Sequence, residues 1–479
     1  MMKNKLSVLY VSAEIAPFGT TGGLGDVGEC LPEVLADNGL NMIRVMPKYK
    51  GLEEKYGLNE VGSFIVETSG KANEAKIYKY EEKRLTTYFI GSREYFERDN
   101  LYGYDDDDIR FGFISKAVLE MLMVLNIKPD VIHVNDWHGG LIPFLLKNEY
   151  KHINFYNSIK TVYTIHNLQY QGVFGSGSLE RIGLSHKYYD SNKLEYYGNI
   201  SFMKGGIIYC DIITTVSDNY AKEIQTPQYG YGLDGILRRY KSKIYGIING
   251  IDYDKFNCET DEYVYRNYNI DNVLMVKYEN KHFLQQKIGL PVKKVPLIGM
   301  VSRLSEQKGI NLCLKAIEEL IDEDLQFVIL GTGDKKYEQA LMDLSNKYPD
   351  KLGVIIDFNQ KMARLIYSGC DFFLMPSLFE PCGLSQIYSM RFGTVPIVRK
   401  TGGLADTVIP FGLNKGTGFV FDRYDVNEFI EAINEGLETY NDEDKWRCIV
   451  ANCMNQRFSW DNSAKKYIEK YNQLIKIKD

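Results

Sequence analysis

TTGGLGDV, at residues 20–27, and KTGGLADT, at residues 400–407, are near copies of each other within one chain. Each follows an apolar run suited to a buried strand and precedes a segment able to form a helix. Paired glycines before a helix let the backbone approach a ligand closely, and the first turn of the helix favours an anion. The repeated phrase therefore predicts two similar α/β domains that hold one phosphate-bearing ligand between them.

Short apolar or β-branched runs alternate with helical segments through both halves of the chain. The runs are 7–12, 42–46, 131–134, 161–165, 212–216 and 244–248, then 297–301, 326–330, 353–356, 372–375 and 395–398. This alternation predicts parallel sheets covered by helices on both faces. Runs without helices between them predict antiparallel additions at 64–68, 76–81 and 86–90. The chain ends in segments that favour helices at 426–439, 443–454 and 462–475.

Length and composition indicate two ordinary globular domains. The chain has 479 residues, of which 44% are hydrophobic and 25% charged. A net charge of -6 excludes a nucleic-acid binder that works through overall positive charge. Residues 249–252 favour a turn, and the polar stretch 253–271 is the best candidate for a linker between the domains. The acidic run 105–108 favours a solvated turn over a metal cluster.

Cysteine usage and hydropathy suggest a cytoplasmic protein. Eight cysteines occur without a C-x-x-C pair, and several lie in apolar stretches, which predicts buried free thiols in a reducing compartment. Lys3 and Lys5 precede a short apolar run, but that run reaches Glu14 without a small-residue cleavage site, which disfavours a signal peptide. No run approaches about 18 uncharged apolar residues, so no membrane span is expected.

Residues 23–28 match G-x-G-x-x-G, but their context argues against a dinucleotide site. The glycines lie about ten residues beyond the first strand, which is too far for the tight turn that the fingerprint requires. The second strand ends in VMPKY, residues 45–49, without an acid to hold a ribose. We therefore reject NAD binding and predict a loop that approaches phosphate or sugar.

Polar residues follow two of the predicted parallel strands, where open α/β sheets bind ligands. Asp136, Trp137 and His138 come after 131–134, and His166 with Asn167 comes after 161–165. The aromatic and polar neighbours of His166 favour a role in ligand binding. His133 and His138 lack the spacing of a metal site, and none is predicted.

Charged residues in the second half form two further candidates. Arg303 and Lys308 lie five residues apart between a strand and a helix, which suits a clamp on a diphosphate. Glu380 precedes Pro381 at an expected helix entrance, where it should remain ionised and can hydrogen-bond sugar hydroxyls or stabilise positive charge at an anomeric carbon.

Together these motifs resemble those of bacterial glycogen synthases and plant starch synthases, over nearly the whole chain. The matching segments are TGGLGDV at 21–27, DWH at 136–138, TIHNL at 164–168, YGYGLDG at 229–235, NGID at 249–252, VSRL at 301–304, QKG at 307–309, FEPCGL at 379–384 and KTGGLAD at 400–406. The resemblance implies the α/β GT-B architecture, with two Rossmann-like doubly wound domains facing each other across a deep cleft. The expected domains are residues 1–253 on the acceptor side, 254–456 on the donor side, and 457–479 as a helix that crosses back to the first.

The resemblance also implies an activity and a set of site residues. A hexosyltransferase would move glucose from ADP-glucose to the non-reducing end of an α-1,4-glucan, with retention of configuration, no metal and no cofactor beyond that co-substrate. The implied catalytic residues are Glu380, Arg303, Lys308 and His166. The implied donor and substrate contacts are Thr20, Gly22, Gly23, Asp26, Asp136, Asn167, Asn249, Phe358, Cys382, Gly383, Leu384, Thr401, Gly402, Gly403 and Leu404.

Within that scheme, Arg303 and Lys308 would hold the diphosphate, and Glu380 would contact the donor glucose. His166 would bind glucose hydroxyls from the first domain, with Asp26 and Asn249 nearby. Gly23, and Gly403 to Leu404, would offer backbone amides to phosphate and sugar. No second carboxylate is placed as a covalent nucleophile, so we favour a front-face path in which the leaving phosphate takes the acceptor's proton.

Phe358 falls where the family often has a tyrosine that stacks on adenine. The sequence departs from the family pattern at three positions: Thr20 replaces a lysine thought to help bind donor, Leu378 replaces an arginine, and Gln360 replaces a glutamate. Weaker donor affinity or an altered nucleotide preference would follow from Thr20.

Two alternatives stay open: a catalytically weak glucan-binding relative, and a glucosyltransferase that uses UDP-glucose or a smaller acceptor. A phosphorylase is disfavoured by the short chain and by the lack of a lysine context for pyridoxal phosphate. The expected partners are ADP-glucose and a glucan, with neither nucleic acid nor membrane. Oligomeric state is left open.

Overall fold

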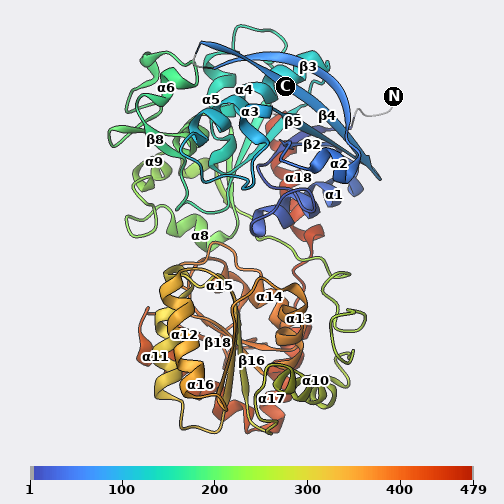
Figure 1. Cartoon of the computed structure of the whole chain (residues 1–479), viewed down its shortest axis with the longest axis vertical. Coiled ribbons are helices and arrows are strands. Elements are labelled where there is room, and N and C mark those ends of the chain that lie inside the picture. Colours follow the sequence, from blue (N-terminus) through green and yellow to red (C-terminus); the bar gives the residue numbers. More distant parts are fainter. Residues whose placement is uncertain (1–4, 69, 477–479) are drawn as a thin grey trace. The chain divides into compact units, whose positions relative to one another are not determined.

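The computed structural model describes residues 5–68 and 70–476 and divides the chain into two compact units (Figure 1). The first contains Met1–Val216, Ala221–Ile247 and Trp460–Asp479, and the second contains Ser217–Tyr220 and Ile248–Ser459. The sequence-based boundaries, after 253 and 456, lie six residues after and three before those of the structure. Residues 249–252 therefore belong to the second unit, and the last helix belongs to the first.

A nine-stranded sheet forms the centre of the first unit, in the order β12-β11-β7-β6-β1-β2-β5-β4-β3. All neighbours pair in parallel except β3 with β4 and β4 with β5, which are antiparallel. This confirms the predicted parallel runs and the antiparallel additions at 64–68 and 76–81, whereas the run 86–90 pairs antiparallel with β4 and parallel with β2. The strands are β1 (Ser7–Val11), β2 (Asn41–Pro47), β3 (Asn59–Thr68), β4 (Lys71–Glu82), β5 (Leu85–Gly91), β6 (Val131–Asn135), β7 (Lys160–Ile165), β11 (Ile212–Thr215) and β12 (Ile244–Gly246).

Helices and one small sheet complete this unit. The small sheet, which the sequence analysis did not anticipate, has the order β8-β10-β9, with β8 (Val173–Gly175), β9 (Glu195–Tyr196) and β10 (Asn199–Ser201). The helices are α1 (Gly23–Asp37), α2 (Leu52–Tyr56), α3 (Arg93–Phe96), α4 (Asp107–Val124), α5 (Leu141–Asn148), α6 (Ser178–Arg181), α7 (Phe202–Tyr209), α9 (Asp234–Arg239) and α18 (Trp460–Lys476), with short 3-10 turns η1 (Trp137–Gly139), η2 (His186–Tyr188) and η3 (Lys241–Lys243). Helix α8 (Asp218–Glu223) has residues in both units.

The C-terminal helix α18 is part of the core of the first unit. Its Tyr467 and Tyr471 are buried in one cluster with Val8 of β1 and Leu31 of α1. The hydroxyl of Tyr471 lies 2.7 Å from Nδ1 of His133, on β6. Because these aromatic side chains are buried in the core of the first unit, the chain returns to that unit after the second.

The second unit is a six-stranded parallel sheet with helices on both faces (Figure 1). Its order is β15-β14-β13-β16-β17-β18. Helices α11, α12 and α16 lie on one face, and α10, α13 and α14 on the other (Figure 1). The strands are β13 (Leu297–Val301), β14 (Gln326–Leu330), β15 (Leu352–Ile355), β16 (Phe372–Met375), β17 (Val395–Arg399) and β18 (Phe419–Phe421). The helices are α10 (Val273–Lys287), η4 (Glu306–Lys308), α11 (Ile310–Glu319), α12 (Lys335–Lys347), α13 (Gln360–Gly369), α14 (Ser385–Arg391), α15 (Gly402–Thr407), α16 (Val426–Tyr440) and α17 (Glu443–Met454).

The stretch 253–271 is not a free linker, contrary to the sequence-based prediction. Phe256, which is buried, stacks on Tyr388 at 3.6 Å between ring centroids and lies 3.5 Å from the guanidinium carbon of Arg364. The Nε of Arg364 donates to the Asp261 carboxylate at 2.8 Å. The aromatic residues spread through this polar stretch thus pack it onto the second unit.

The acidic run 105–108 is likewise only partly a solvated turn. Asp107 is buried, pairs with the fully buried Arg110, and accepts hydrogen bonds from the backbone N–H groups of Gly103 and Tyr104. Asp108 is also buried and lies 3.2 Å from Arg181. Because α4 begins at Asp107, its first turn carries these carboxylates into the interior, where the arginines balance them.

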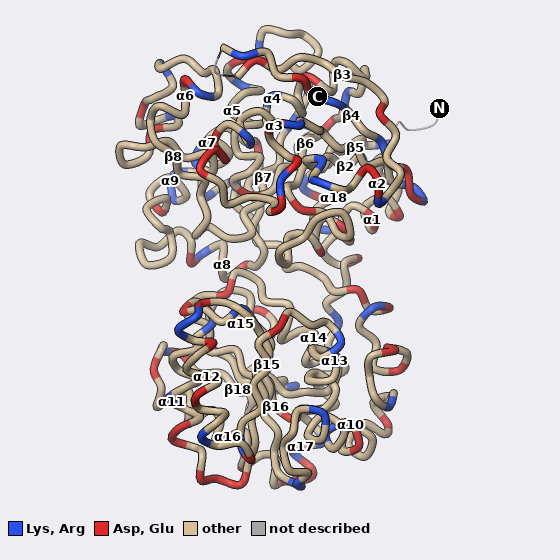
Figure 2. Tube along the Cα trace, in the orientation of Figure 1, with Lys and Arg blue, Asp and Glu red and all other residues tan. Residues whose placement is uncertain are grey.

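Six of the eight cysteines are buried and all eight are free, as predicted for unpaired thiols. Lys and Arg alternate with Asp and Glu along both units, without a long segment of one sign (Figure 2). Among the described residues, no helix is both long enough and apolar enough to cross a membrane.

Candidate active site

The glycine loop of the first unit is held by Glu14, which follows strand β1. The side chain of Glu14 is 2% exposed and accepts hydrogen bonds from the backbone N–H groups of Thr21 and Gly22 and from Oγ1 of Thr21 at 2.8 Å. The hydroxyl of Tyr102 donates to the same carboxylate at 2.5 Å. In the sequence alone, Glu14 stands out only as the end of an apolar run. A carboxylate directly after a buried strand was the signal that could have found it.

The glycines of this loop have two different uses. A side chain at Gly28 would lie 2.7 Å from the carbonyl oxygen of Glu14, and one at Gly25 would lie 2.3 Å from Oγ1 of Thr20. Gly22, directly before α1, has open space around it. The later glycines therefore pack the helix against its own loop, and the open approach expected for a ligand is at Gly22 and the start of α1 at Gly23. Asp26 lies in the first turn of that helix.

Asp136 orders the loop that carries His166. It adopts a positive φ of 51° at the end of β6, and its Oδ1 accepts from the backbone N–H groups of His166 at 2.8 Å and Asn167 at 3.4 Å. Burial raises the pKa of Asp136 to about 7, against the lowering effect of these hydrogen bonds. The structure thus brings Asp136, His166 and Asn167 together, as the ends of adjacent parallel strands should.

His166 is held as a neutral imidazole. Burial lowers its pKa to about 3, and its Nε2 lies 2.9 Å from Oδ1 of Asn135. An amide oxygen only accepts, so Nε2 carries the proton and Nδ1 is left as an acceptor. Asn135 is itself oriented by its Nδ2, which donates to the carbonyl of Val11, and by the hydroxyl of Tyr10. Asn135 is a second site residue that the sequence analysis missed, although it immediately precedes Asp136.

The other two histidines of these strands are packing residues. His133 is fully buried between the hydroxyls of Tyr471 and Thr164. His138 stacks on Trp137 at 4.0 Å between ring centroids, and burial lowers its pKa to about 3. Among the described residues, no three histidine, cysteine, aspartate or glutamate side chains gather as metal ligands.

The functional centre of the second unit is a buried ion pair. The Nζ of Lys308 lies 2.9 Å from Oε1 and 2.6 Å from Oε2 of Glu380. The Glu380 side chain is 6% exposed and that of Lys308 17% exposed. Ser377 adds a hydroxyl donor to Oε2 at 3.0 Å. One carboxylate is thus neutralised and oriented by three donated hydrogen bonds.

The surroundings of this pair differ from the sequence-based expectation. Helix α14 begins at Ser385, after Gly383 at φ 70° and Leu384 at the N-cap, so Glu380 is balanced by Lys308 and not by a helix entrance. The loop before Glu380 is held by Arg399 of β17, whose Nε donates to the carbonyl of Ser377 at 2.8 Å. Arg303 lies in the same unit, exposed just past the end of β13.

The second glycine pair meets the Glu380 loop and not open space. A side chain at Gly402, where φ is 44°, would lie 2.0 Å from the carbonyl oxygen of Glu380, and one at Gly403 would lie 2.0 Å from that of Cys382. The N–H of Gly403 donates to the Glu380 carbonyl at 2.9 Å, and that of Leu404 to the carbonyl of Thr401, the N-cap of α15. The expectation that these two amides are offered to a ligand is therefore wrong for this structure, because both already donate within the protein.

Asn249 and Phe358 complete the predicted set. Asn249 is buried in the second unit, where its backbone N–H contacts the Cys382 thiol, and its expected place near His166 stays a prediction. Its Oδ1 has no hydrogen-bond partner among the described residues. Burial raises the pKa of the Cys382 thiol to about 12. Phe358 is 80% exposed between β15 and α13, so its ring is open to a stacking partner.

Two doubly wound α/β units, one with a neutral histidine at its strand ends and the other with a buried lysine–glutamate pair, define a glycosyltransferase of the GT-B class. Family models described as the starch synthase catalytic domain and as glycosyl transferases group 1 match residues 7–239 and 281–449. The chain belongs to the glycogen and starch synthase family.

Relatives match it from end to end. The glycogen synthase of Desulforudis audaxviator is 45% identical over 99% of this chain and 98% of its own length, and that of Clostridioides difficile is 44% identical over 98% and 100%. A solved structure of the catalytic domain of starch synthase IV from Arabidopsis thaliana, bound to ADP and acarbose, has a TM-score of 0.92 and 32% identity. That comparison covers 98% of this chain and 100% of the other.

Proposed function

We propose that this protein transfers glucose from ADP-glucose to the non-reducing end of an α-1,4-glucan with retention of configuration, and that the Lys308–Glu380 pair is the centre of the donor site. The observation that carries the proposal is this buried pair in a chain whose full-length relatives are glycogen synthases. The ADP in the starch synthase IV structure and its oligosaccharide ligand, acarbose, support the same donor and acceptor classes.

Lys308 and Arg303 act on the leaving diphosphate. An ammonium group has three N–H donors, and two of those on Lys308 are directed at the Glu380 oxygens. Glu380 therefore fixes the direction of the third, which is free to bind a phosphate oxygen together with the guanidinium of Arg303. Cleavage of the sugar–phosphate bond places negative charge on that oxygen, so fixed cations lower the barrier where charge develops.

Each unit holds an acceptor atom that suits a sugar hydroxyl. Nδ1 of the half-buried His166 and Oδ1 of the buried Asn249 are hydrogen-bond acceptors on side chains or backbone held by hydrogen bonds. A neutral imidazole accepts from a hydroxyl without introducing a second positive charge near the developing oxocarbenium ion. Glu380, the carboxylate that we assign to the donor sugar in the second unit, offsets that ion's charge.

Retention proceeds by a front-face path in this proposal. As a nucleophile Glu380 would have to leave both Lys308 and Ser377, which hold both of its oxygens. The leaving phosphate, beside Lys308 and Arg303, instead accepts the proton of the incoming hydroxyl. Isolation of a glucosyl ester on Glu380 would contradict this path.

Exposed tyrosines in the first unit form an acceptor surface. Tyr197, 76% exposed, and Tyr231, 36% exposed, both adopt positive φ, which is uncommon outside glycine and asparagine. The hydroxyl of Tyr196 and Nε2 of Gln171 both donate to the carbonyl oxygen of Tyr231, and this fixes the loop. Because this surface follows the His166 strand end in sequence and folds in the same unit, it is suited to stack on the sugar rings of a glucan.

The experiment is a transfer assay with radiolabelled ADP-glucose or UDP-glucose and glycogen. We expect label in the polymer from ADP-glucose, and a loss of at least about 1,000-fold in kcat when Arg303 and Lys308 are both replaced by alanine. Replacement of the exposed Lys335 in α12 is the matched control. Unchanged turnover in the double variant would refute the assigned roles.

Thr20 favours one rival, a glucan-binding relative with weak catalysis. In the structure Thr20 is exposed and its Oγ1 donates to the carbonyl of Gly22 at 3.1 Å, so the loop presents no cation at this position. Binding to glycogen without measurable transfer from either nucleotide sugar would favour that rival.

A further inference from the structure

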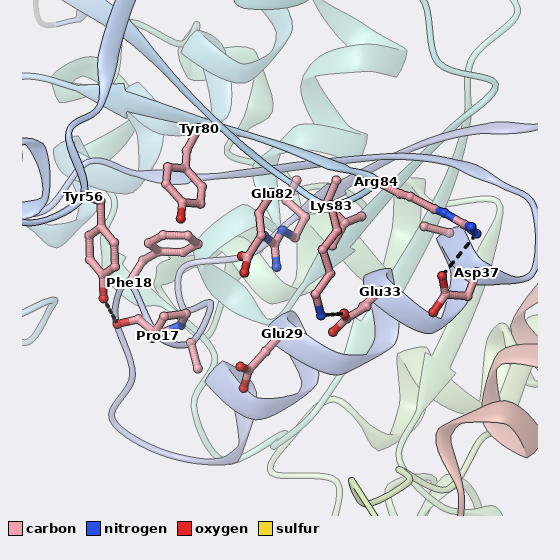
Figure 3. Close-up of a pocket in the computed structure, with 14 residues that line it drawn as sticks. Pro17, Phe18, Glu29, Glu33, Asp37, Tyr56, Tyr80, Glu82, Lys83 and Arg84 are labelled. Atoms are coloured by element: carbon pink, nitrogen blue, oxygen red, sulfur yellow. Dashed lines mark hydrogen bonds and ion pairs between the residues drawn. The ribbon is translucent and has the colours of Figure 1, made fainter. Parts of the chain in front are cut away.

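A cavity of about 390 Å³ opens in the first unit (Figure 3). It lies between α1 and the hairpin of β4 and β5, and the segments that follow β1 and form α2 close one end. None of the residues assigned above to donor or acceptor lines it. Its volume is at the small end of the range for ligand pockets, which limits an occupant to one or two hexose-sized rings.

One end of the cavity is an aromatic wall. Phe18, Tyr56 and Tyr80 pack edge to face, with Phe18 centroids 4.9 Å from Tyr56 and 5.4 Å from Tyr80. The Tyr56 hydroxyl donates to the carbonyl of Pro17 at 3.0 Å, which fixes that ring (Figure 3). A fixed aromatic wall offers an apolar surface to the C–H face of a ring.

The cavity is also lined by a buried guanidinium. Arg44 of β2 is 3% exposed, and its Nε donates to Oγ1 of Thr87 at 2.9 Å. Among the described residues Arg44 has no other hydrogen bond and no ion pair, so its terminal nitrogens remain available to an occupant. Burial lowers its pKa, and the carboxylates of Glu82, Glu33 and Glu29 act in the opposite direction. Arg44 is thus a charged, nine-tenths buried donor without a carboxylate partner.

Two ion pairs join the hairpin turn to α1 across the far end (Figure 3). Lys83, at φ 51°, places Nζ 2.5 Å from Oε1 of Glu33, and Arg84 lies 3.4 Å from Asp37. These pairs neutralise the carboxylates of Glu33 and Asp37 in the lining of the cavity. Glu82 has no ion-pair partner among the described residues, so a carboxylate and a guanidinium both face an occupant.

The mixture of charges selects the class of ligand. An anion would meet Glu82, and a cation would meet Arg44, so each would be repelled by part of the lining. A neutral polyhydroxylated ring satisfies both, since its hydroxyls donate to a carboxylate and accept from a guanidinium while its C–H face covers the aromatic wall. We propose that this pocket binds a neutral sugar of one or two hexose rings, either as a free sugar or as the end of a glucan chain.

The test uses Tyr80→Trp in the full chain as a fluorescent reporter, without a nucleotide sugar. Maltose should change the emission of this variant saturably, and the same titration of the wild-type protein subtracts the response of its own tryptophans. Adding Glu82→Gln should weaken the affinity by about tenfold, as expected for loss of one charged hydrogen bond. The matched control is Glu81→Gln, because Glu81 points to the opposite face of the strand and pairs with Lys79.

Charged analogues and polymer separate the remaining possibilities. Glucosamine and gluconate should bind at least about tenfold more weakly than maltose, and competition by glycogen would assign the site to chain ends while its absence would assign it to free sugars. No saturable signal, equal affinity with Glu82→Gln, or preference for a charged analogue would overturn the proposal. Because the readout is binding without donor, failure here leaves the transfer reaction untouched.

Discussion

Removing the lysine of the Lys308–Glu380 pair should destabilise the second unit in a pH-dependent way. In Lys308→Met the Glu380 carboxylate stays buried with only the Ser377 hydroxyl as a donor. Stranding one member of a buried ion pair costs about 3–5 kcal/mol. The folded protein can limit that cost by taking up a proton.

The free energy needed to protonate the carboxylate sets the expected loss of stability. A glutamate with an ordinary pKa of about 4.3 is protonated at a cost of about 4 kcal/mol at pH 7 and about 1 kcal/mol at pH 5. The variant should therefore lose about 3–4 kcal/mol relative to wild type at pH 7, and only about 1 kcal/mol at pH 5. For a unit of this size these losses correspond to a fall in Tm of about 6–16 °C and about 2–4 °C.

Scanning calorimetry of wild type and variant at both pH values measures the difference. The double variant Lys308→Met with Glu380→Gln should recover most of the stability, because it removes the unpaired buried charge. It should remain inactive, because it also lacks the lysine and the carboxylate that we assign to catalysis. Arg447→Met is the matched control, since the Arg447–Glu443 pair is exposed on both sides and should be worth less than about 1 kcal/mol. Equal losses at pH 5 and pH 7, or a double variant as unstable as the single one, would refute this reasoning.

Three further outcomes are expected. Thr20→Lys should lower the KM for ADP-glucose by about tenfold or more, because a charge-assisted contact contributes roughly 1.5–3 kcal/mol. The neutral control Thr20→Gln should leave the KM unchanged. An unchanged KM for Thr20→Lys in initial-rate assays would contradict our account of that loop. Tyr197→Ala should raise the KM for glycogen about tenfold at unchanged kcat, whereas Tyr197→Phe, which keeps the ring, should not. Asp136 has its folded pKa raised to about 7, so the folded state binds the extra proton and stability falls as pH rises from about 4 to 7. The free energy of unfolding of Asp136→Asn relative to wild type should accordingly grow across that window and level off above it, and a flat difference in denaturant titrations would show that Asp136 does not titrate there.

The strand pattern was predictable because fully buried parallel strands are short and apolar. All eleven runs assigned to parallel strands lie in the two main sheets, and the antiparallel additions are in the first. The three-stranded β8-β10-β9 sheet was missed, since strands of two or three residues carry no periodicity. The stretch 253–271 was misassigned because its polar composition concealed the aromatic residues that pack it down.

The candidate site was predictable where motif residues stand at strand ends. Asp136 with His166, and Lys308 with Glu380, come together as the topology of parallel sheets requires. The partners that orient them were not predictable. These partners are Glu14, Asn135 and Arg399, which act through tertiary hydrogen bonds. The local spacing of residues in a sequence does not predict such bonds. The use of Gly402 and Gly403 was also hidden, because a glycine that admits a ligand and one that admits the protein's own backbone look alike in sequence.

The position of α18 has a consequence for how the polypeptide matures during synthesis. The first unit needs Trp460, Tyr467 and Tyr471 to cover β1, β6 and α1, and the ribosome delivers these residues after the whole second unit. The second unit, by contrast, has all of its residues once Ser459 has emerged. A nascent chain therefore carries an uncovered apolar face around Leu31 and Leu35 until α18 has emerged, so the first unit is completed only after the second.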